Sequence, residues 1–531
     1  MLNTARATHA VAVAPHHLAA QSALAVMREG GNAIEAMVAA AATIATVYPH
    51  MNGIGGDSFW VILPPGAAPV AIDACGPAAL GAGIDAYHAR GLTTIPVRGP
   101  LAANTVAGTI GGWHAATVLA AELGGTMPVS RLLADAIGYA ENGVPVTVSQ
   151  QNATAAKFAE LEAHPGFCEQ FLINGQLPKA GQRFVQPRLA RTLSMLVRDG
   201  LDSYYRGPLA KEIAADLHTV GSLVTGDDLA AYHATRTVPL HLAHSQGDLY
   251  NMTPPTQGVV SLTILGLLDR VGLNKVEADS ADHVHLVVEA TKRAFAMRDT
   301  HVTDPADMSV EPQSLLDGAH LDALAADIQL NKAAAWGQGK GPGDTIWMGV
   351  IDQNGLAVSF IQSIYHEFGS GVVLPTTGIN WQNRGASFSL DPAHLLTLKP
   401  GKKPFHTLNP AAARLHDGRV MVYGTMGGDG QPQTQAAVFT RHVVFGQPLQ
   451  TAVTAPRWLL GRTWGQSSES LKLEQRFPQA VVDALRQRGH EVEILQAFDE
   501  TMGHAGAIVR HPDGMLEGAT DPRSDGGVAA W

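Results

Sequence analysis

The sequence has few of the features that mark secreted, membrane-spanning or nucleic-acid-binding proteins. Two cysteines among 531 residues, Cys75 and Cys168, are too few for a disulfide framework, and two free thiols in a reducing compartment are expected. Charged residues are only 16% of the chain, and the net charge of −11 is spread along the sequence. A phosphate backbone calls for clustered Lys and Arg, so this charge pattern argues against nucleic acid as a partner. The longest apolar run, residues 36–47, would span about 18 Å as a helix, short of the ~30 Å core of a bilayer. With no signal peptide at its start, the chain is expected to be soluble and cytoplasmic, without nucleic-acid or membrane partners.

Glycine and alanine are abundant instead, and the length suits two ordinary domains or one large α/β body. Residues 10–14 and 58–63 favour strands, and residues 106–334 are expected to be mostly helical. The glycine cluster at residues 53–57 lacks the Lys-Ser/Thr end of a phosphate-binding loop and precedes a strand, so close backbone packing is expected there. The clearest helical segments are residues 16–27, 32–47, 129–142, 186–199, 208–217 and 283–299.

The pattern changes abruptly near residue 345. Residues 337–344 form a linker rich in glycine that ends in Asp344, whereas residues 345–351 form a β-run that is apolar on both faces. A turn at residues 352–355 leads into a returning strand over residues 356–364. Strands buried on both faces predict a sheet that is covered by further layers on each side.

This junction could support catalysis because a threonine at a chain N-terminus can use its own α-amine to activate its hydroxyl. Cleavage between Asp344 and Thr345 would create such a threonine, although the pattern alone favours an ordinary threonine at a strand start. If the hairpin loop has three residues with a left-handed Gly355, Ser363 lies opposite Thr345, about 5 Å away at Cβ. A two-residue loop would turn Ser363 to the other face.

Motifs along nearly the whole chain resemble those of the γ-glutamyltransferase family. The matching segments are residues 30–33, 53–57, 104–108, 345–352, 354–355, 368–371, 424–428, 455–457 and 518–523. The resemblance implies an α+β fold, the four-layer αββα sandwich of N-terminal-nucleophile hydrolases, built from two fragments of one self-cleaved precursor. Residues 1–344 would be the large subunit, mostly helical with part of the sheet. Residues 345–531 would be the small subunit, which begins with the nucleophile strand.

The resemblance also implies the catalytic groups. Thr345 would be the nucleophile of an acyl-enzyme mechanism, and Ser363 matches the family's second threonine. The backbone N–H groups of Gly427 and Gly428 would hold the oxyanion, where losing one donor typically costs about 3 kcal/mol; a plain turn is the alternative for these glycines. No cofactor or metal is implied, and the 23 histidines show no His-Glu-x-x-His or Cys-x-x-Cys frame.

The positions that bind a γ-glutamyl group in the family differ here. Asp73 stands where a carboxylate-binding arginine is expected, and Ser387 where an amine-binding carboxylate is expected. Arg384 adds positive charge beside the site, so an anion without an amine is favoured. Tyr365 is larger than the amide residue it replaces and should narrow the pocket. A solvated surface Arg384 and a packed or surface His406 are the alternatives. The predicted substrate-binding residues are Tyr365, Arg384, Ser387, His406 and Thr407.

These departures resemble the oxamate amidohydrolase branch of the family, which acts on the monoamide of oxalic acid from purine breakdown. We therefore expect a self-processing amidohydrolase of the EC 3.5.1 class that cleaves a small anionic acid amide, with oxamate favoured over longer amides. The alternatives are a γ-glutamyl hydrolase or transferase acting on glutathione-like substrates, a glutaryl or cephalosporin acylase, and a non-enzymatic metabolite-binding relative. The expected partner is the chain's own cleaved fragment in a heterodimer. Pairing of heterodimers, substrate chain length, and hydrolysis against acyl transfer stay open.

Overall fold

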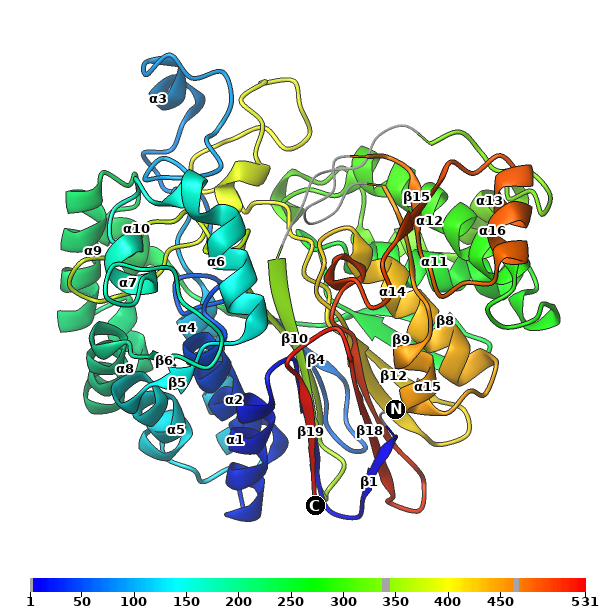
Figure 1. The fold of residues 1–531 in the computed structure, drawn as a ribbon, viewed down its shortest axis with the longest axis horizontal. Helices are drawn as coiled ribbons and strands as arrows, with labels where there is room; N and C mark the ends of the chain where they lie inside the picture. The colour runs from blue at the N-terminus through cyan, green and yellow to red at the C-terminus, as the bar shows by residue number, and fades with distance from the viewer. Residues whose placement is uncertain (1–2, 337–343, 462–467) are drawn as a thin grey trace.

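In the computed structural model, which describes residues 3–336, 344–461 and 468–531, two seven-stranded sheets are stacked between helices (Figure 1). The β10 sheet contains, in order across the sheet, β19 (Gly527–Ala530), β2 (Val11–Ala14), β10 (Asp344–Ile351), β11 (Ala357–Tyr365), β3 (Asp57–Leu63), β4 (Val70–Ala74) and β7 (Thr235–Thr237). The β13 sheet contains β1 (Ala5–Ala7), β18 (Leu516–Thr520), β17 (Gly506–Arg510), β13 (Val420–Gly424), β12 (Ala411–Leu415), β9 (Gly247–Asn251) and β8 (Leu240–His244).

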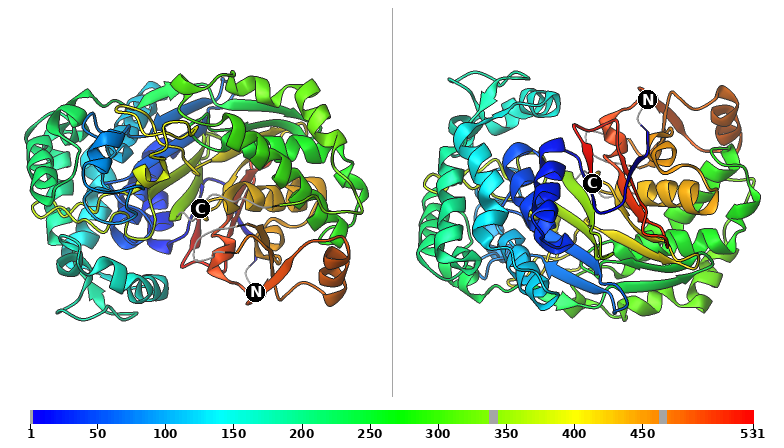
Figure 2. Two further views of the ribbon diagram at one scale, coloured as in Figure 1. Left: turned by 90° about the horizontal axis from the view of Figure 1, so that it is seen from above. Right: turned by 90° about the horizontal axis from the view of Figure 1, so that it is seen from below.

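Helices cover the outer face of each sheet, as the views from above and below in Figure 2 make clear. The β10 side carries α1 (His17–Arg28), α2 (Ala33–Val47), α4 (Thr109–Glu122), α5 (Val129–Asn142), α6 (Val148–Leu161), α8 (Pro187–Asp199) and α9 (Pro208–Val220). The β13 side carries α11 (Gly258–Arg270), α12 (Ala281–His301), α13 (Gly318–Ala326), α14 (Gly430–Phe439), α15 (Leu449–Thr454) and α16 (Gln479–Gln487). Short helices and strands complete the fold: α3 (Ile84–His88), α7 (Phe167–Phe171), α10 (Gly226–Ala231), β5 (Val144–Pro145), β6 (Arg183–Phe184), β14 (Trp458–Leu460), β15 (Leu471–Glu474) and β16 (Val492–Leu495). The expected αββα layering is confirmed.

The strand β10 is buried on both faces, as its sequence predicts. Ile346, Met348 and Val350 pack in the core beneath the helices, whereas Trp347 and Ile351 pack in the core between the two sheets. Alternating side chains of one strand thus join two separate apolar cores. Trp347 belongs to the inter-sheet core, where its Nε1 donates a hydrogen bond of 3.0 Å to Ser359 Oγ.

The hairpin between β10 and β11 has the three-residue loop that places Ser363 opposite Thr345. Ile351 pairs with Ala357, the Asp352 N–H donates to the Leu356 carbonyl at 3.2 Å, and Gly355 has a left-handed φ of 84°. The Asp352 side chain also accepts a hydrogen bond of 3.0 Å from the backbone of Ala33, at the start of α2. The hairpin is therefore fixed both by its own turn and by the neighbouring helix.

Most of the predicted elements form within a few residues of their expected bounds. The six predicted helical segments correspond to α1, α2, α5, α8, α9 and α12. The expectation of mostly helical structure over residues 106–334 omits the strands β5 to β9, whose short length gives little period-two signal. The linker predicted at residues 337–344 lies outside the described residues, apart from the backbone of Asp344.

Two further expectations are confirmed by the structure. Cys75 and Cys168 are both free thiols. A Cβ on Gly56 would lie 2.0 Å from the carbonyl oxygen of Ser363, so the glycine cluster serves close backbone packing. In the described parts of the chain no helix combines the length and apolarity needed to cross a membrane.

Candidate active site

Thr345 lies near the start of the central strand β10 and is fully buried. Its Oγ1 donates a hydrogen bond of 3.3 Å to Ser363 Oγ on β11, as the hairpin register requires. Between the pairs Asp344–Tyr365 and Ile346–Gln362, one residue of β10 faces two residues of β11. This β-bulge lies directly opposite Thr345 and interrupts the regular strand pairing at the predicted cleavage bond. Bulges beside functional sites often change the direction of a side chain.

A row of polar groups extends from Thr345 across the sheet. Ser363 pairs in turn with Asp57, the first residue of β3, so three adjacent strands each contribute one polar residue. Cross-strand neighbours project from the same face, which here is the face toward the β13 sheet. The row therefore lies at one end of the inter-sheet core, where a buried polar group needs a partner.

Gly427 and Gly428 form the turn between β13 and α14. Both have left-handed backbone conformations, with φ values of 113° and 52°, which only glycine adopts without strain. The Gly428 carbonyl accepts a hydrogen bond of 2.9 Å from Gln257 Nε2, and Arg298 in turn donates to Gln257 Oε1 at 3.1 Å. The turn is thus held rigidly at the N-terminus of α14, where backbone N–H groups and the helix dipole favour negative charge.

Close packing brings this turn to the start of β10. A Cβ on Gly424, the last residue of β13, would lie 2.1 Å from Cδ1 of Trp347, two residues beyond Thr345. On the other side of the turn, Asp429 lies near Tyr365. Burial raises the pKa of the Tyr365 phenol, and the charge of Asp429 raises it further, whereas Arg384 lowers it. The segments that carry the hydroxyl pair and the glycine turn therefore pack close to each other.

Arg384 is buried, at 1% exposure, which excludes the alternative of a solvated surface arginine. It begins a short 3₁₀ helix (Arg384–Ser387), and its guanidinium stacks 3.8 Å from the ring centre of Tyr365. Nη1 donates weakly to the Phe405 carbonyl at 3.4 Å, and among the described residues Nη2 has no hydrogen-bond partner. Burying a cation without a counter-ion is costly, so this arrangement points to an anion that binds there.

Three of the other four predicted substrate-binding residues also have a buried polar atom without a partner. Ser387 Oγ, His406 Nδ1 and Thr407 Oγ1 are buried and have no hydrogen-bond partner among the described residues. Tyr365, Ser387 and Thr407 line a cavity of about 500 Å³, together with residues 93–97 and the segment 388–396. Buried polar groups are normally satisfied, so a cluster of unsatisfied ones beside a cavity indicates a ligand site. His366 lines the same cavity.

Asp73, which replaces the expected arginine, does not face the site as an isolated acid. Its Oδ2 lies 2.6 Å from Lys403 Nζ, and its Oδ1 accepts from the backbone of Cys75 at 2.9 Å. The pair neutralises the charge at this position, whereas Arg384 forms no ion pair with a described residue.

Sequence reasoning missed Asp57. Its Oδ1 accepts hydrogen bonds from the backbone of Gly76 and Gly108, at 3.0 and 2.9 Å, and its Oδ2 lies 3.1 Å from His406 Nε2. Burial raises the pKa of Asp57 to about 7. Burial also lowers the pKa of His406 well below its usual value, and Arg384 and Lys403 lower it further. The sequence signal that could have identified Asp57 is its position as an acidic residue at the head of an otherwise apolar strand.

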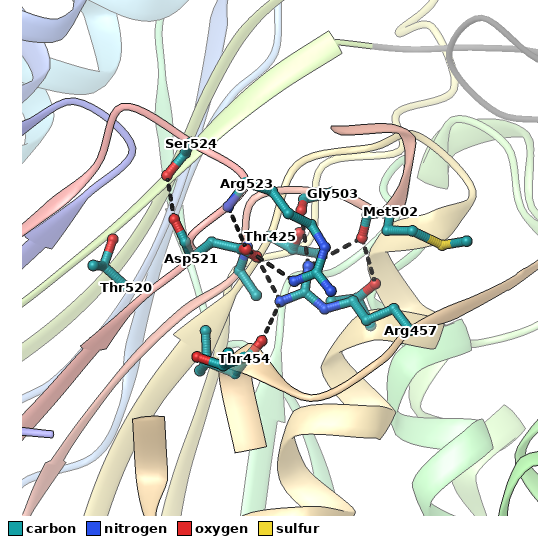
Figure 3. Close-up of polar contacts among 12 residues, drawn as sticks. Thr425, Thr454, Arg457, Met502, Gly503, Thr520, Asp521, Arg523 and Ser524 are labelled. Atoms are coloured by element: carbon teal, nitrogen blue, oxygen red, sulfur yellow. Dashed lines mark hydrogen bonds and ion pairs between the residues drawn. The ribbon is translucent and has the colours of Figure 1, made fainter. Parts of the chain in front are cut away.

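Two family-like motifs far apart in the sequence meet in an ion-pair network beside the glycine turn (Figure 3). Asp521 lies between Arg457 and Arg523, at 2.5 and 3.0 Å, and Arg523 also pairs with Glu474 at 2.7 Å. Arg457 donates to the carbonyl of Gly503 at 2.8 Å, which places the Gly503 Cα 3.7 Å from a Cβ built on Gly427. The network therefore supports the backbone against which the glycine turn packs.

Replacing Asp521 with asparagine is expected to lower the free energy of unfolding by about 3–5 kcal/mol, because two buried arginines lose their shared partner. Burial opposes ionisation of Asp521, but Arg457 and Arg523 outweigh it and lower its pKa. The carboxylate therefore stabilises the fold above its unfolded pKa, and this contribution is lost as the pH falls through the lower, folded value. In urea unfolding, the difference in the free energy of unfolding between the wild type and Asp521→Asn should be constant between pH 8 and about 5. It should shrink below about pH 4. The exposed Asp417→Asn should change stability by less than about 1 kcal/mol.

A sandwich of two sheets between helices, with a buried threonine hydroxyl at the head of a central strand, is the arrangement that an N-terminal-nucleophile hydrolase requires. The sequence profile of the gamma-glutamyltranspeptidase family matches residues 19–531, and the chain belongs to this family. It is therefore an N-terminal-nucleophile amidohydrolase of the gamma-glutamyltranspeptidase family.

Individual relatives cover almost the whole chain. The oxamate amidohydrolase proenzyme of Klebsiella pneumoniae is 64% identical over 525 residues, which is 99% of each chain. The glutathione hydrolase-like YwrD proenzyme of Bacillus subtilis is 38% identical over 98% of each chain. The crystal structure of cephalosporin acylase from Bacillus halodurans matches with a TM-score of 0.91 at 33% identity, covering 100% of this chain and 97% of that chain.

Proposed function

We propose that the chain cuts itself between Asp344 and Thr345 and that the product hydrolyses oxamate to oxalate and ammonia. Residues 1–344 and 345–531 would form the large and small subunits of one heterodimer. Thr345 Oγ1 attacks the amide carbon, and the new α-amine of Thr345 takes the hydroxyl proton. The backbone N–H groups of Gly427 and Gly428 stabilise the oxyanion while the C–N bond breaks, and the α-ammonium gives its proton to the leaving ammonia. Water then cleaves the oxalyl ester and restores the threonine.

The observation that carries the substrate class is the buried Arg384, whose Nη2 has no hydrogen-bond partner in the described part of the chain. Its open Nη2 and the free atoms of His406 and Thr407 offer donors to a carboxylate. Ser387 supplies no negative charge for an ammonium group, and among the described residues no carboxylate forms an ion pair with Arg384. A γ-glutamyl substrate would therefore bury its α-ammonium without a partner, whereas an acid amide would not.

The relatives support the same choice. The 64% identical relative is named for oxamate, and the relatives reported above that are at least 38% identical are both proenzymes, in agreement with self-cleavage. The cephalosporin acylase fold supports a second candidate, hydrolysis of a larger acyl amide, because the cavity of about 500 Å³ exceeds the size of oxamate. Oxamate is preferred because the relative named for it is 64% identical to this chain, whereas the cephalosporin acylase is 33% identical.

The purified enzyme is expected to release ammonia from oxamate and to show no turnover of a γ-glutamyl anilide. Because charge rather than length decides binding, the neutral oxamide should be at least about 100-fold poorer than oxamate in kcat/KM, the scale of one lost charged contact. A coupled assay for ammonia measures all three substrates. Faster turnover of the γ-glutamyl anilide, or of glutaryl amides, would refute the oxamate assignment and favour the corresponding alternative.

A further inference from the structure

Asp57 has no role in the proposed reaction, yet it lies beside His406 at the end of the polar row that begins at Thr345. Asp57 Oδ2 and His406 Nε2 are 3.1 Å apart, both residues are buried, and neither atom has a hydrogen-bond partner among the described residues. A carboxylate oxygen and an imidazole lone pair at this distance repel each other unless one of them carries a proton. The pair therefore needs a proton between the two atoms.

The position of that proton decides what the other ring nitrogen can do. When Asp57 is ionised, the proton lies on His406 Nε2, and Nδ1 of the neutral ring is a hydrogen-bond acceptor. When Asp57 takes up a proton, its Oδ2–H can donate to Nε2, and the ring proton moves to Nδ1, which becomes a donor. His406 Nδ1 is buried without a partner in the described structure, so it is available for a ligand.

The positive charge that Arg384 offers to a ligand depends on the same proton. Ionised Asp57 offsets part of the charge of Arg384, whereas protonated Asp57 leaves the full positive charge for a ligand. The surrounding groups do not replace this effect. Burial holds the pKa values of Cys75, Tyr204, Tyr205 and Tyr232 well above neutrality, and Lys403 is paired with Asp73. The nearby amide of Gln382 does not titrate.

We propose that Asp57 is a positioning residue that couples anion binding to proton uptake: the Asp57–His406 pair gains one proton when a substrate carboxylate binds at Arg384. The inference rests on the proposed function for the identity of the anion. It explains why an acid lies beside the cation that receives the carboxylate, since its protonated form supplies a donor instead of a repelling charge. Burial sets the titration of Asp57 near neutral pH.

The test is the pH dependence of KM for oxamate, whose own carboxyl is ionised above about pH 5. KM should be constant below about pH 7 and then rise by up to about tenfold per pH unit, while kcat follows the separate titration of the Thr345 amine. Asp57→Asn keeps an oxygen for the backbone of Gly76 and Gly108 and a donor for His406. It should hold KM at the low-pH value throughout.

Two further variants separate this coupling from a structural effect. His406→Gln leaves a fixed donor to an ionised Asp57, so its KM at pH 6 should rise to the wild-type value at pH 8. Glu500→Gln is the matched control, because burial raises the pKa of Glu500 to about 7 as well, but Glu500 does not contact the pair. It should retain the wild-type KM profile.

The outcomes separate this inference from the proposed function. A flat wild-type KM, or a pH slope that survives in Asp57→Asn or disappears in Glu500→Gln, overturns the coupling while oxamate hydrolysis stands. If the wild type does not hydrolyse oxamate, calorimetric titration with pyruvate, which replaces the amide nitrogen of oxamate with a methyl group, decides the coupling. Weaker binding at pH 8 than at pH 6 that is absent in Asp57→Asn supports the coupling. Equal binding at both pH values, or no binding, overturns it.

Discussion

Thr345→Ala is expected to run as a single 55.8 kDa chain on a denaturing gel, whereas the wild type runs as two fragments. The substitution removes the hydroxyl that attacks the preceding carbonyl and later the substrate, so both reactions stop. Amide hydrolysis should fall by at least about 10⁴-fold, the scale seen when a hydrolase loses its nucleophile. Gel densitometry and the ammonia assay measure the two effects on the same sample.

Two controls define this result. Thr345→Ser retains a hydroxyl and should still be cut, although more slowly. Thr154→Ala removes another fully buried threonine hydroxyl, one that donates to the Gln150 carbonyl within α6, and should be cut like the wild type. An alanine variant that still yields fragments 1–344 and 345–531 would place the nucleophile elsewhere.

Replacing Arg384 with methionine should have opposite effects on activity and stability. The substrate carboxylate loses a buried charged partner, so kcat/KM for oxamate should fall by roughly 30- to 5,000-fold, which corresponds to about 2–5 kcal/mol. The fold loses a buried cation for which the described residues offer no counter-ion within ion-pair distance, so the free energy of unfolding should rise by about 1–4 kcal/mol. Steady-state kinetics and urea unfolding of the same preparation provide both values.

Arg298 is the matched control because it is equally buried but forms ion pairs with two carboxylates. It contacts Asp299 at 2.9 Å and Asp429 at 2.8 Å. Arg298→Met would leave the buried Asp429 carboxylate without that partner and should destabilise the protein by about 3–5 kcal/mol. If Arg384→Met destabilises the fold as Arg298→Met does, then Arg384 has a structural role and is not kept for binding a substrate.

The geometry around Thr345 could be predicted because it depends on neighbours in the chain. A left-handed Gly355 fixes the loop length, the alternation of β10 fixes which side chains face the sheets, and together they place Ser363 opposite Thr345. The folded chain adds the bulge on β11, which local patterns do not reveal. The assignment of Thr345 as nucleophile stays a prediction that the gel experiment tests.

The substrate side of the site could be predicted only in part, because it depends on contacts between distant segments. The sequence leaves the burial of Arg384 open, since the residues that cover it, Tyr365 and Phe405, belong to other segments. The contact between Asp57 and His406 joins β3 to a loop hundreds of residues later and carries no periodic signal. Single-sequence reasoning finds the residue types of such a site but not which of them meet.

The proposed cut would divide both sheets internally rather than separate two halves of the molecule. β10 and β11 lie between β2 and β3, so strands from residues 345–531 are flanked by strands from residues 1–344, and the β13 sheet is similarly mixed. Dilution would therefore not release the fragments, since separation requires both sheets to unfold. The continuous chain is what brings these strands together with a small loss of entropy. Once the bond is gone, refolding becomes a concentration-dependent encounter of two chains, and the mature enzyme persists by the slowness of its unfolding.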